Sequence, residues 1–154
     1  MHAHRLNAYE LAPAGMKALQ NVEGYLHQTT LGSQLIELVK MRASQINGCA
    51  YCLDMHSKVL RKGGETEQRI YLLNGWRESP LYTPRERAAL SWTETLTRIA
   101  ETQAPDDVYE ELRRHFDDKE VVDLTTLIGM INLWNRLAIS LRYEHPVDAA
   151  ARAA

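Results

Sequence analysis

The segment from Val121 to Leu141 is the one long apolar stretch of the chain, and it limits the possible folds more than any other part of the sequence. A helix of this length could span a lipid bilayer. The segment nevertheless contains four polar or charged residues that are costly in hydrocarbon, namely Asp123, Asn132, Asn135 and Arg136. We therefore expect a helix buried in the core of a folded domain rather than a membrane span.

The rest of the chain also has the apolar spacing of helices. No segment shows a sustained alternation of apolar and polar residues, and no Asn-Gly or Asp-Gly pair lies between two β-branched runs, as a β-hairpin would require. We therefore predict an all-α fold. Together with their caps, the expected helices cover residues 11–27, 33–46, 47–64, 67–74, 83–100, 105–116 and 117–145.

Capping residues mark where several of these helices begin. The strongest signal is Thr83-Pro84-x-Glu86, because threonine suits the cap, proline suits the first helical position and glutamate completes a capping box. The other expected caps are Ser33, Asn47 and either Asp117 or Asp118.

Length predicts one domain, and the charge pattern gives no sign of a nucleic-acid-binding surface. We expect a single domain over residues 1–154, because neither side of the clearest loop, Gly75 to Pro84, looks able to close a core alone. The tails, residues 1–8 and 147–154, are expected to fray. The 18 basic and 20 acidic residues are mixed along the chain, so neither a nucleic acid nor a membrane is an expected partner. The start, Met1 to Leu6, lacks the apolar run of a secretory signal, which predicts a cytoplasmic location.

The chain contains two cysteines, Cys49 and Cys52, three residues apart. A structural disulfide framework needs more cysteines and an oxidising compartment. Two neighbouring thiols in a reducing compartment indicate redox chemistry or metal binding instead.

His56 turns this pair into a candidate reactive site. If Asn47 caps the helix, then Cys49, Cys52 and His56 form one helical stripe, and the positive helix end favours a thiolate. His56 could accept the Cys52 proton or stabilise its thiolate. Glu37, on the preceding helix, could orient His56 if the two helices pack as an antiparallel hairpin.

Three other interpretations fit the same residues. The pair with His56 could be part of a structural zinc site, although the chain has no second cysteine pair. The two cysteines could also be buried and inert. A third possibility is a redox-sensing or protein-interaction module that uses the dithiol as a switch without turnover.

The motif as a whole resembles a known family. Glu37, followed twelve residues later by Cys49-x-x-Cys52-x-x-x-His56, is similar to the core motif of the AhpD-like alkylhydroperoxidases within the carboxymuconolactone decarboxylase superfamily. The likeness spans about residues 19–141. Segments that carry it are ELVKMRASQINGC at 37–49, TPRERAAL at 83–90 and INLWNR at 131–136, the last two resembling peroxidase-related members.

The resemblance implies a single-domain AhpD-like helical bundle that assembles as a homotrimer or homohexamer. It also implies reduction of alkyl or hydrogen peroxide without a metal or organic cofactor. On that model Cys52 attacks the peroxide and becomes a sulfenic acid, and Cys49 condenses with it to a disulfide. An external dithiol reductant or reducing protein reopens the disulfide, while Glu37 and His56 relay protons.

Two points in the sequence conflict with that model. Position at the helix start favours Cys49 as the thiol of lower pKa, whereas the family model makes Cys52 the attacker, which His56 four residues later supports. Tyr51 stands where the best-known members carry a histidine, and a phenol cannot shuttle protons near neutral pH as imidazole does. The superfamily's decarboxylases do not use a cysteine pair as their chemical centre, so decarboxylation is the less favoured activity.

Overall fold

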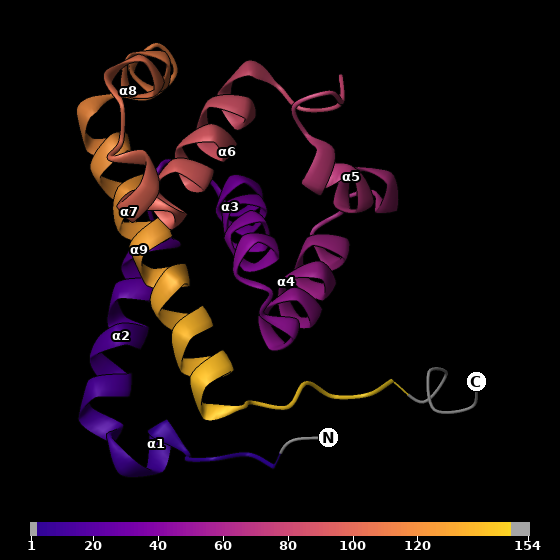
Figure 1. Cartoon of the computed structure of the whole chain (residues 1–154), viewed down its shortest axis with the longest axis vertical. Helices are drawn as coiled ribbons and strands as arrows, with labels where there is room; N and C mark the ends of the chain where they lie inside the picture. The colour runs from indigo at the N-terminus through magenta and orange to yellow at the C-terminus, as the bar shows by residue number, and fades with distance from the viewer. Residues whose placement is uncertain (1–2, 149–154) are drawn as a thin grey trace.

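The computed structural model describes residues 3–148, and every regular element in that range is helical (Figure 1). This confirms the predicted all-α fold. The elements in chain order are α1 (Ala8–Leu11), α2 (Pro13–Leu26), α3 (Ser33–Asn47), α4 (Ala50–Lys62), α5 (Glu67–Leu72), the 3₁₀ turn η1 (Leu73–Gly75), α6 (Pro84–Thr97), α7 (Ile99–Thr102), α8 (Asp106–Arg113) and α9 (Asp118–Leu141).

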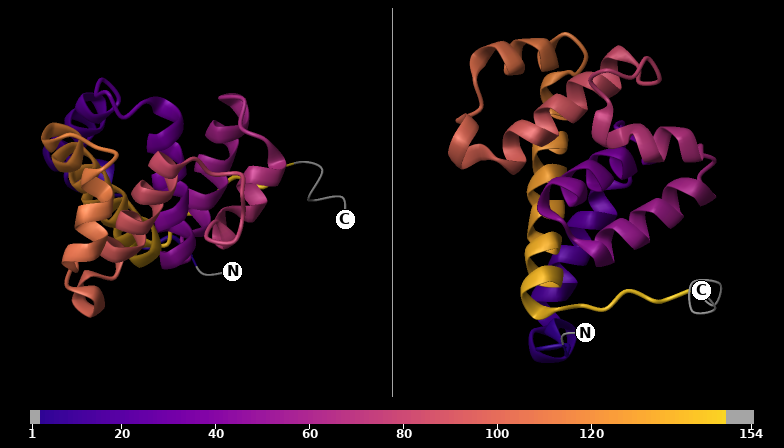
Figure 2. Two further views of the ribbon diagram at one scale, coloured as in Figure 1. Left: turned by 90° about the horizontal axis from the view of Figure 1, so that it is seen from above. Right: turned by 45° about the vertical axis from the view of Figure 1, so that its right-hand side comes forward.

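Helix α9 is the long helix expected from the apolar segment, and it runs along one side of the bundle (Figures 1 and 2). Its apolar residues Leu124, Leu127 and Ile128 lie in the main core together with Ile36 and Val39 of α3. None of the helices within residues 3–148 is long and apolar enough to cross a membrane.

Helix α3 lies at the centre of the bundle, where it packs against α4, α6 and α9. All residues from Leu35 to Ser44 are buried, including the charged Glu37, Lys40 and Arg42. A buried charge requires a partner, and Arg42 finds one in Glu94 of α6, whose carboxylate accepts a hydrogen bond of 2.8 Å from its guanidinium Nε. The polar residues of α3 therefore link helices rather than face solvent.

The capping predictions had mixed outcomes. Thr83 and Asp117 both form complete capping boxes, with Glu86 and Glu120 as the reciprocal acceptors. The prediction that Ser33 caps α3 was wrong, because Ser33 is already the first helical residue and Gly32, at φ 82°, occupies the cap. A side-chain cap cannot form at Gly32, whereas its positive φ is open to glycine without strain.

The predicted 11–27 helix corresponds to α2, which begins at Pro13, and the short helix α1 before it was not predicted. The predicted 83–100 helix breaks at Arg98 into α6 and α7. The tail prediction lies partly outside the described residues, at 1–2 and 149–154; inside them, the Arg5 backbone N–H donates to the Leu141 carbonyl at 2.9 Å.

Candidate active site

The turn between α3 and α4 places the two cysteines. Gly48 adopts the left-handed conformation, at φ 68°, which ends α3 and starts α4 almost at once. Cys49 is then the N-cap of α4, with its sulfur accepting the backbone N–H of Cys52 at 3.4 Å. The prediction that Asn47 caps this helix was wrong, because Asn47 is the last residue of α3.

The sulfurs of Cys49 and Cys52 lie 2.6 Å apart, and both residues are buried and free of disulfide bonds. The hydrogen bond from the Cys52 thiol lowers the pKa of Cys49 to about 7, despite the opposing effect of burial. The same hydrogen bond, together with burial, raises the pKa of Cys52 well above its usual range. Negative charge on the pair therefore resides on Cys49, while Cys52 holds the shared proton.

Two asparagine side chains of α9 form hydrogen bonds with residues at the end of α3, next to the turn that carries the cysteines. The side-chain amide of Asn47 donates to the carbonyl oxygens of Asn132 and Asn135, at 3.0 and 2.8 Å. Asn135 in turn donates to the Ser44 hydroxyl at 3.0 Å and also helps to lower the pKa of Cys49. The polar residues that interrupt the apolar segment thus fix the loop that carries the dithiol.

His56 and Glu37 meet across the α3–α4 hairpin. His56 Nδ1 lies 2.7 Å from Glu37 Oε2, and both side chains are buried. Burial alone would raise the pKa of Glu37, but the hydrogen bond and charge of His56 and the charge of Lys40 bring it below its usual value. Ionised Glu37 therefore accepts the Nδ1 proton, which leaves His56 Nε2 available to exchange a proton on its other side.

A buried ion-pair network continues from Glu37. Lys40 is 5% exposed, and its ammonium lies 3.8 Å from Glu37 Oε1 and 2.7 Å from Glu23 Oε2 of α2. Glu23 also accepts the indole N–H of Trp134 at 2.8 Å, and His27 Nε2 lies 3.3 Å from the Lys40 ammonium. This network was not predicted from the sequence, where its only signals are the i, i+3 spacing of Glu37 and Lys40 and the i, i+4 spacing of Glu23 and His27.

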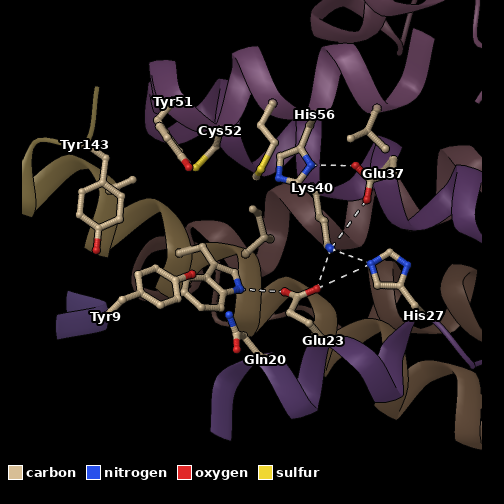
Figure 3. A pocket seen from close by; sticks show the side chains of 15 residues that line it. Tyr9, Gln20, Glu23, His27, Glu37, Lys40, Tyr51, Cys52, His56 and Tyr143 are labelled. Carbon is tan, nitrogen blue, oxygen red and sulfur yellow. Dashed lines mark hydrogen bonds and ion pairs between the residues drawn. The ribbon is translucent and has the colours of Figure 1, made fainter. Parts of the chain in front are cut away.

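The two cysteines border different cavities. Cys52, together with His56, Glu37 and Lys40, lines a cavity of about 410 Å³ (Figure 3). Cys49 lines a smaller neighbouring cavity of about 260 Å³ instead. Most other residues around the larger cavity are apolar or aromatic, among them Tyr9, Tyr51, Met55, Ile131, Trp134 and Tyr143. A small organic molecule in this cavity would meet Cys52 before Cys49.

Tyr51, between the cysteines, contributes an aromatic wall. Its ring packs edge-on against Tyr143 with the ring centres 5.8 Å apart. Burial raises the pKa of Tyr51, so its phenol stays protonated near neutral pH. Among residues 3–148 there is no group of three or more His, Cys, Asp or Glu side chains placed to hold a metal ion.

The structure thus brings together all four residues singled out from the sequence, on a Cys-x-x-Cys helix start and the helix before it. This fold and this arrangement define the AhpD-like class of helical proteins. The chain belongs to the carboxymuconolactone decarboxylase family, whose sequence profile matches residues 13–95. Membership confirms the resemblance drawn from the motif.

Relatives extend over most of the chain. The uncharacterized protein YdfG of Bacillus subtilis (strain 168) is 45% identical over 139 residues, or 90% of this chain and 95% of YdfG. A solved structure from Agrobacterium tumefaciens, ATU0492, a protein of unknown function suggested to be the antioxidant defence protein AhpD, is 49% identical with a TM-score of 0.91. That match covers 95% of this chain and all of the other. An uncharacterized peroxidase-related protein from Silicibacter sp. TM1040 is 26% identical over 91% of this chain and 74% of its own, with a TM-score of 0.80.

Proposed function

We propose that the chain is a thiol peroxidase that reduces alkyl or hydrogen peroxide through the Cys49–Cys52 pair. The observation that carries the proposal is the pair of adjacent sulfurs, 2.6 Å apart, with Cys52 on an apolar cavity that also contains the His56–Glu37 pair. The suggested antioxidant role of the Agrobacterium relative and the peroxidase-related description of the Silicibacter protein support it.

The first step oxidises Cys52. Its thiol gives a proton to His56 Nε2, while Glu37 accepts the Nδ1 hydrogen bond. The Cys52 thiolate attacks the terminal peroxide oxygen, so an S–O bond forms and the O–O bond breaks. The departing alkoxide takes the proton from His56 and leaves as an alcohol, or as water from hydrogen peroxide. Cys52 is now a sulfenic acid.

The second step restores the dithiol in two exchanges. The Cys49 thiolate attacks the Cys52 sulfur, which forms the disulfide and releases hydroxide that is protonated to water. An external dithiol reductant then attacks the disulfide, closes its own disulfide and returns both cysteines to the reduced form. The two electrons for the peroxide thus come from that dithiol, a small molecule or a reducing protein, and no metal or organic cofactor takes part.

Turnover with a dithiol tests the proposal. The purified chain with dihydrolipoamide should consume cumene hydroperoxide or hydrogen peroxide over many cycles. Mass spectrometry without the dithiol should find one Cys49–Cys52 disulfide per chain. One oxidation event and no further consumption would support a redox switch instead, and stoichiometric zinc that is lost in Cys49→Ser would contradict the redox proposal.

Single-cysteine variants test the two roles. Cys52→Ser should block oxidation by peroxide, whereas Cys49→Ser should accumulate a sulfenic acid that a dimedone probe traps on Cys52. The opposite pattern would reverse the assignment. His56→Gln should slow Cys52 oxidation about 100-fold, because it removes an acid–base group. The matched control, His145→Gln, changes an exposed histidine that does not line the cavity, and it should not slow this oxidation.

The assembly and setting are also proposed. We infer a homotrimer or homohexamer in the cytoplasm, acting on small hydroperoxides rather than on nucleic acid or membranes. Sedimentation or light scattering would measure the number of subunits, and a monomer would contradict this part of the proposal alone.

A further inference from the structure

The charged side chains around the larger cavity carry an excess of negative charge. Within the described part of the chain, its lining includes two carboxylates, Glu23 and Glu37, and one lysine, Lys40. The lysine is 5% exposed, so its charge lies inside the protein rather than in solvent. The cysteine pair adds further negative charge, because the pKa of Cys49 is about 7. A ligand in this cavity therefore meets a negative environment.

The Lys40 ammonium is fully occupied by protein groups. It lies 2.7 Å from Glu23 Oε2, 3.8 Å from Glu37 Oε1 and 3.3 Å from His27 Nε2, an arrangement that Figure 3 shows. An ammonium has only donors, so His27 Nε2 accepts this hydrogen bond as a neutral imidazole. The three hydrogens of Lys40 thus have three partners. An anionic ligand would have to displace one of them.

His56 does not change this balance of charge. Its Nδ1 lies 2.7 Å from Glu37 Oε2, and its Nε2 is buried without a partner among the described residues. In the proposed cycle His56 becomes positively charged only by taking the proton of Cys52, which becomes a thiolate in the same step. The sum of the charges around the cavity is therefore the same before and after this transfer.

The remaining wall of the cavity fits an uncharged organic group. Aromatic and aliphatic side chains form it, namely Tyr9, Tyr51, Met55, Val59, Ile131, Trp134, Ala138 and Tyr143. The cavity measures about 410 Å³, within the range of roughly 300–1,000 Å³ that is usual for small-molecule sites. A water molecule occupies about 30 Å³ in the liquid, so hydrogen peroxide would leave most of this volume unfilled.

We propose that the cavity selects uncharged organic hydroperoxides and excludes anionic ones, with Glu23 as a specificity-determining residue. This inference deepens the proposed peroxidase function, and its reference to hydroperoxides rests on that function. The apolar wall receives the organic group, while Glu23 and Glu37 repel a carboxylate. One excess negative charge about 10 Å from the ligand disfavours an anion about tenfold at an effective dielectric constant of about 20.

Glu23 is the better of the two carboxylates to change. Glu37 accepts the hydrogen bond of His56, so its replacement would also alter the proposed proton transfer. Glu23 instead accepts hydrogen bonds from the Lys40 ammonium and the Trp134 indole, at 2.7 and 2.8 Å. Its charge can therefore be removed without touching the groups that react.

Binding of a matched pair of ligands tests the charge preference without turnover. The probes are two derivatives of cumyl alcohol, the product expected from cumene hydroperoxide, with a carboxamide or a carboxylate in the para position. They have the same shape and differ by one charge. Isothermal titration calorimetry at neutral pH should give a Kd that is about tenfold lower for the carboxamide. The carboxamide should also slow iodoacetamide alkylation of Cys52, because this residue lines the same cavity.

Glu23→Gln keeps the shape of the side chain and removes its charge. The ratio of the carboxylate Kd to the carboxamide Kd should fall about tenfold in this variant. The matched control Glu101→Gln makes the same change of charge at an exposed glutamate of α7 that does not line the cavity, and the ratio should stay as in the wild type.

The wild-type comparison decides the charge selection even if Glu23→Gln does not fold. Equal Kd values in the wild-type chain, or tighter binding of the carboxylate, would overturn the proposal. A folded Glu23→Gln variant with an unchanged ratio would overturn the role of Glu23.

The corresponding hydroperoxides separate this inference from the proposed function. In single turnover, the para-carboxamide of cumene hydroperoxide should oxidise Cys52 about tenfold faster than the para-carboxylate. Equal rates with the two would overturn the charge selection alone. Cysteines that react with neither would overturn the proposed function, whereas the binding of the two alcohols would still decide which charge the cavity accepts.

Discussion

Replacing Cys52 by alanine removes the hydrogen bond that contributes most to the low pKa of Cys49. That pKa is about 7 in the folded chain against an ordinary value of 9.0. The backbone N–H of residue 52 and the Asn135 amide still reach Cys49 in the variant, so part of the effect should remain. We expect the pKa to rise by about one to two units, equivalent to about 1.4 to 2.7 kcal/mol. At pH 7 the thiolate fraction should fall from about half to between about 10% and 1%.

The assay is a titration of the thiolate by its ultraviolet absorbance and by the pH dependence of iodoacetamide alkylation, with the modified residue identified by peptide mapping. Cys52→Ser is the matched control, because its hydroxyl can still donate a hydrogen bond toward Cys49. The midpoints should therefore increase in the order wild type, Cys52→Ser, Cys52→Ala. A Cys52→Ala variant that still titrates near 7 would refute the reasoning that the neighbouring thiol lowers the pKa of Cys49.

Three further predictions concern the charges around the site. Lys40→Met leaves buried carboxylates without their cation and should lower the free energy of unfolding, measured by urea denaturation, by about 3–5 kcal/mol. Lys58→Met, at an exposed ion pair, should leave that free energy nearly unchanged. Glu37→Gln should slow peroxide oxidation of Cys52 about 100-fold, while Glu111→Gln, which removes a surface carboxylate next to a histidine, should not; equal rates would contradict the relay. Because the pKa of Cys49 is lower in the folded chain than in the unfolded chain, its ionisation stabilises the reduced fold. This stabilisation is complete above pH 9 and is lost as the pH falls through about 7. Stability of the reduced chain should therefore rise between pH 7 and 9, and Cys49→Ser should lack this rise.

The helical fold could be predicted because its signals are local. The polar interruptions of the apolar segment excluded a membrane helix, and the capping boxes at Thr83 and Asp117 are contained within four residues each. The cap of α4 was predicted wrongly because it depends on the backbone conformation of Gly48. Asn47 is a good capping residue by type, but α3 continues through Asn47 and ends at the left-handed Gly48. Cys49 is therefore the N-cap of α4.

The site could be predicted only where residues lie on one helix or fit a known motif. The pairing of Glu37 with His56 was predicted with the help of the family motif, because sequence spacing across a turn does not show that two residues are close. Glu23 lies on α2 and Asn135 on α9, and both reach the site only through tertiary packing. Tyr143 depends on a left-handed residue at the end of α9, which the sequence does not mark with a glycine. These contributions cannot be read from periodicity, because each one joins segments far apart in the chain.

The asymmetry between the two cysteines makes helix position and the family model compatible with each other. Position and hydrogen bonding give Cys49 the lower pKa, whereas Cys52 lines the larger cavity, which we propose receives the substrate. In the proposed cycle a thiolate at Cys49 is useful twice. It is ionised when it must attack the sulfenic acid of Cys52, and a thiol of low pKa is also the better leaving group when an external dithiol attacks Cys52. Attack by peroxide and attack by the reductant would then both occur at Cys52, through the same cavity, so the alcohol must leave before the dithiol can enter. Excess alcohol product should therefore compete with the dithiol and slow reduction of the disulfide. If added alcohol does not slow that step, the dithiol has a second entrance at Cys49.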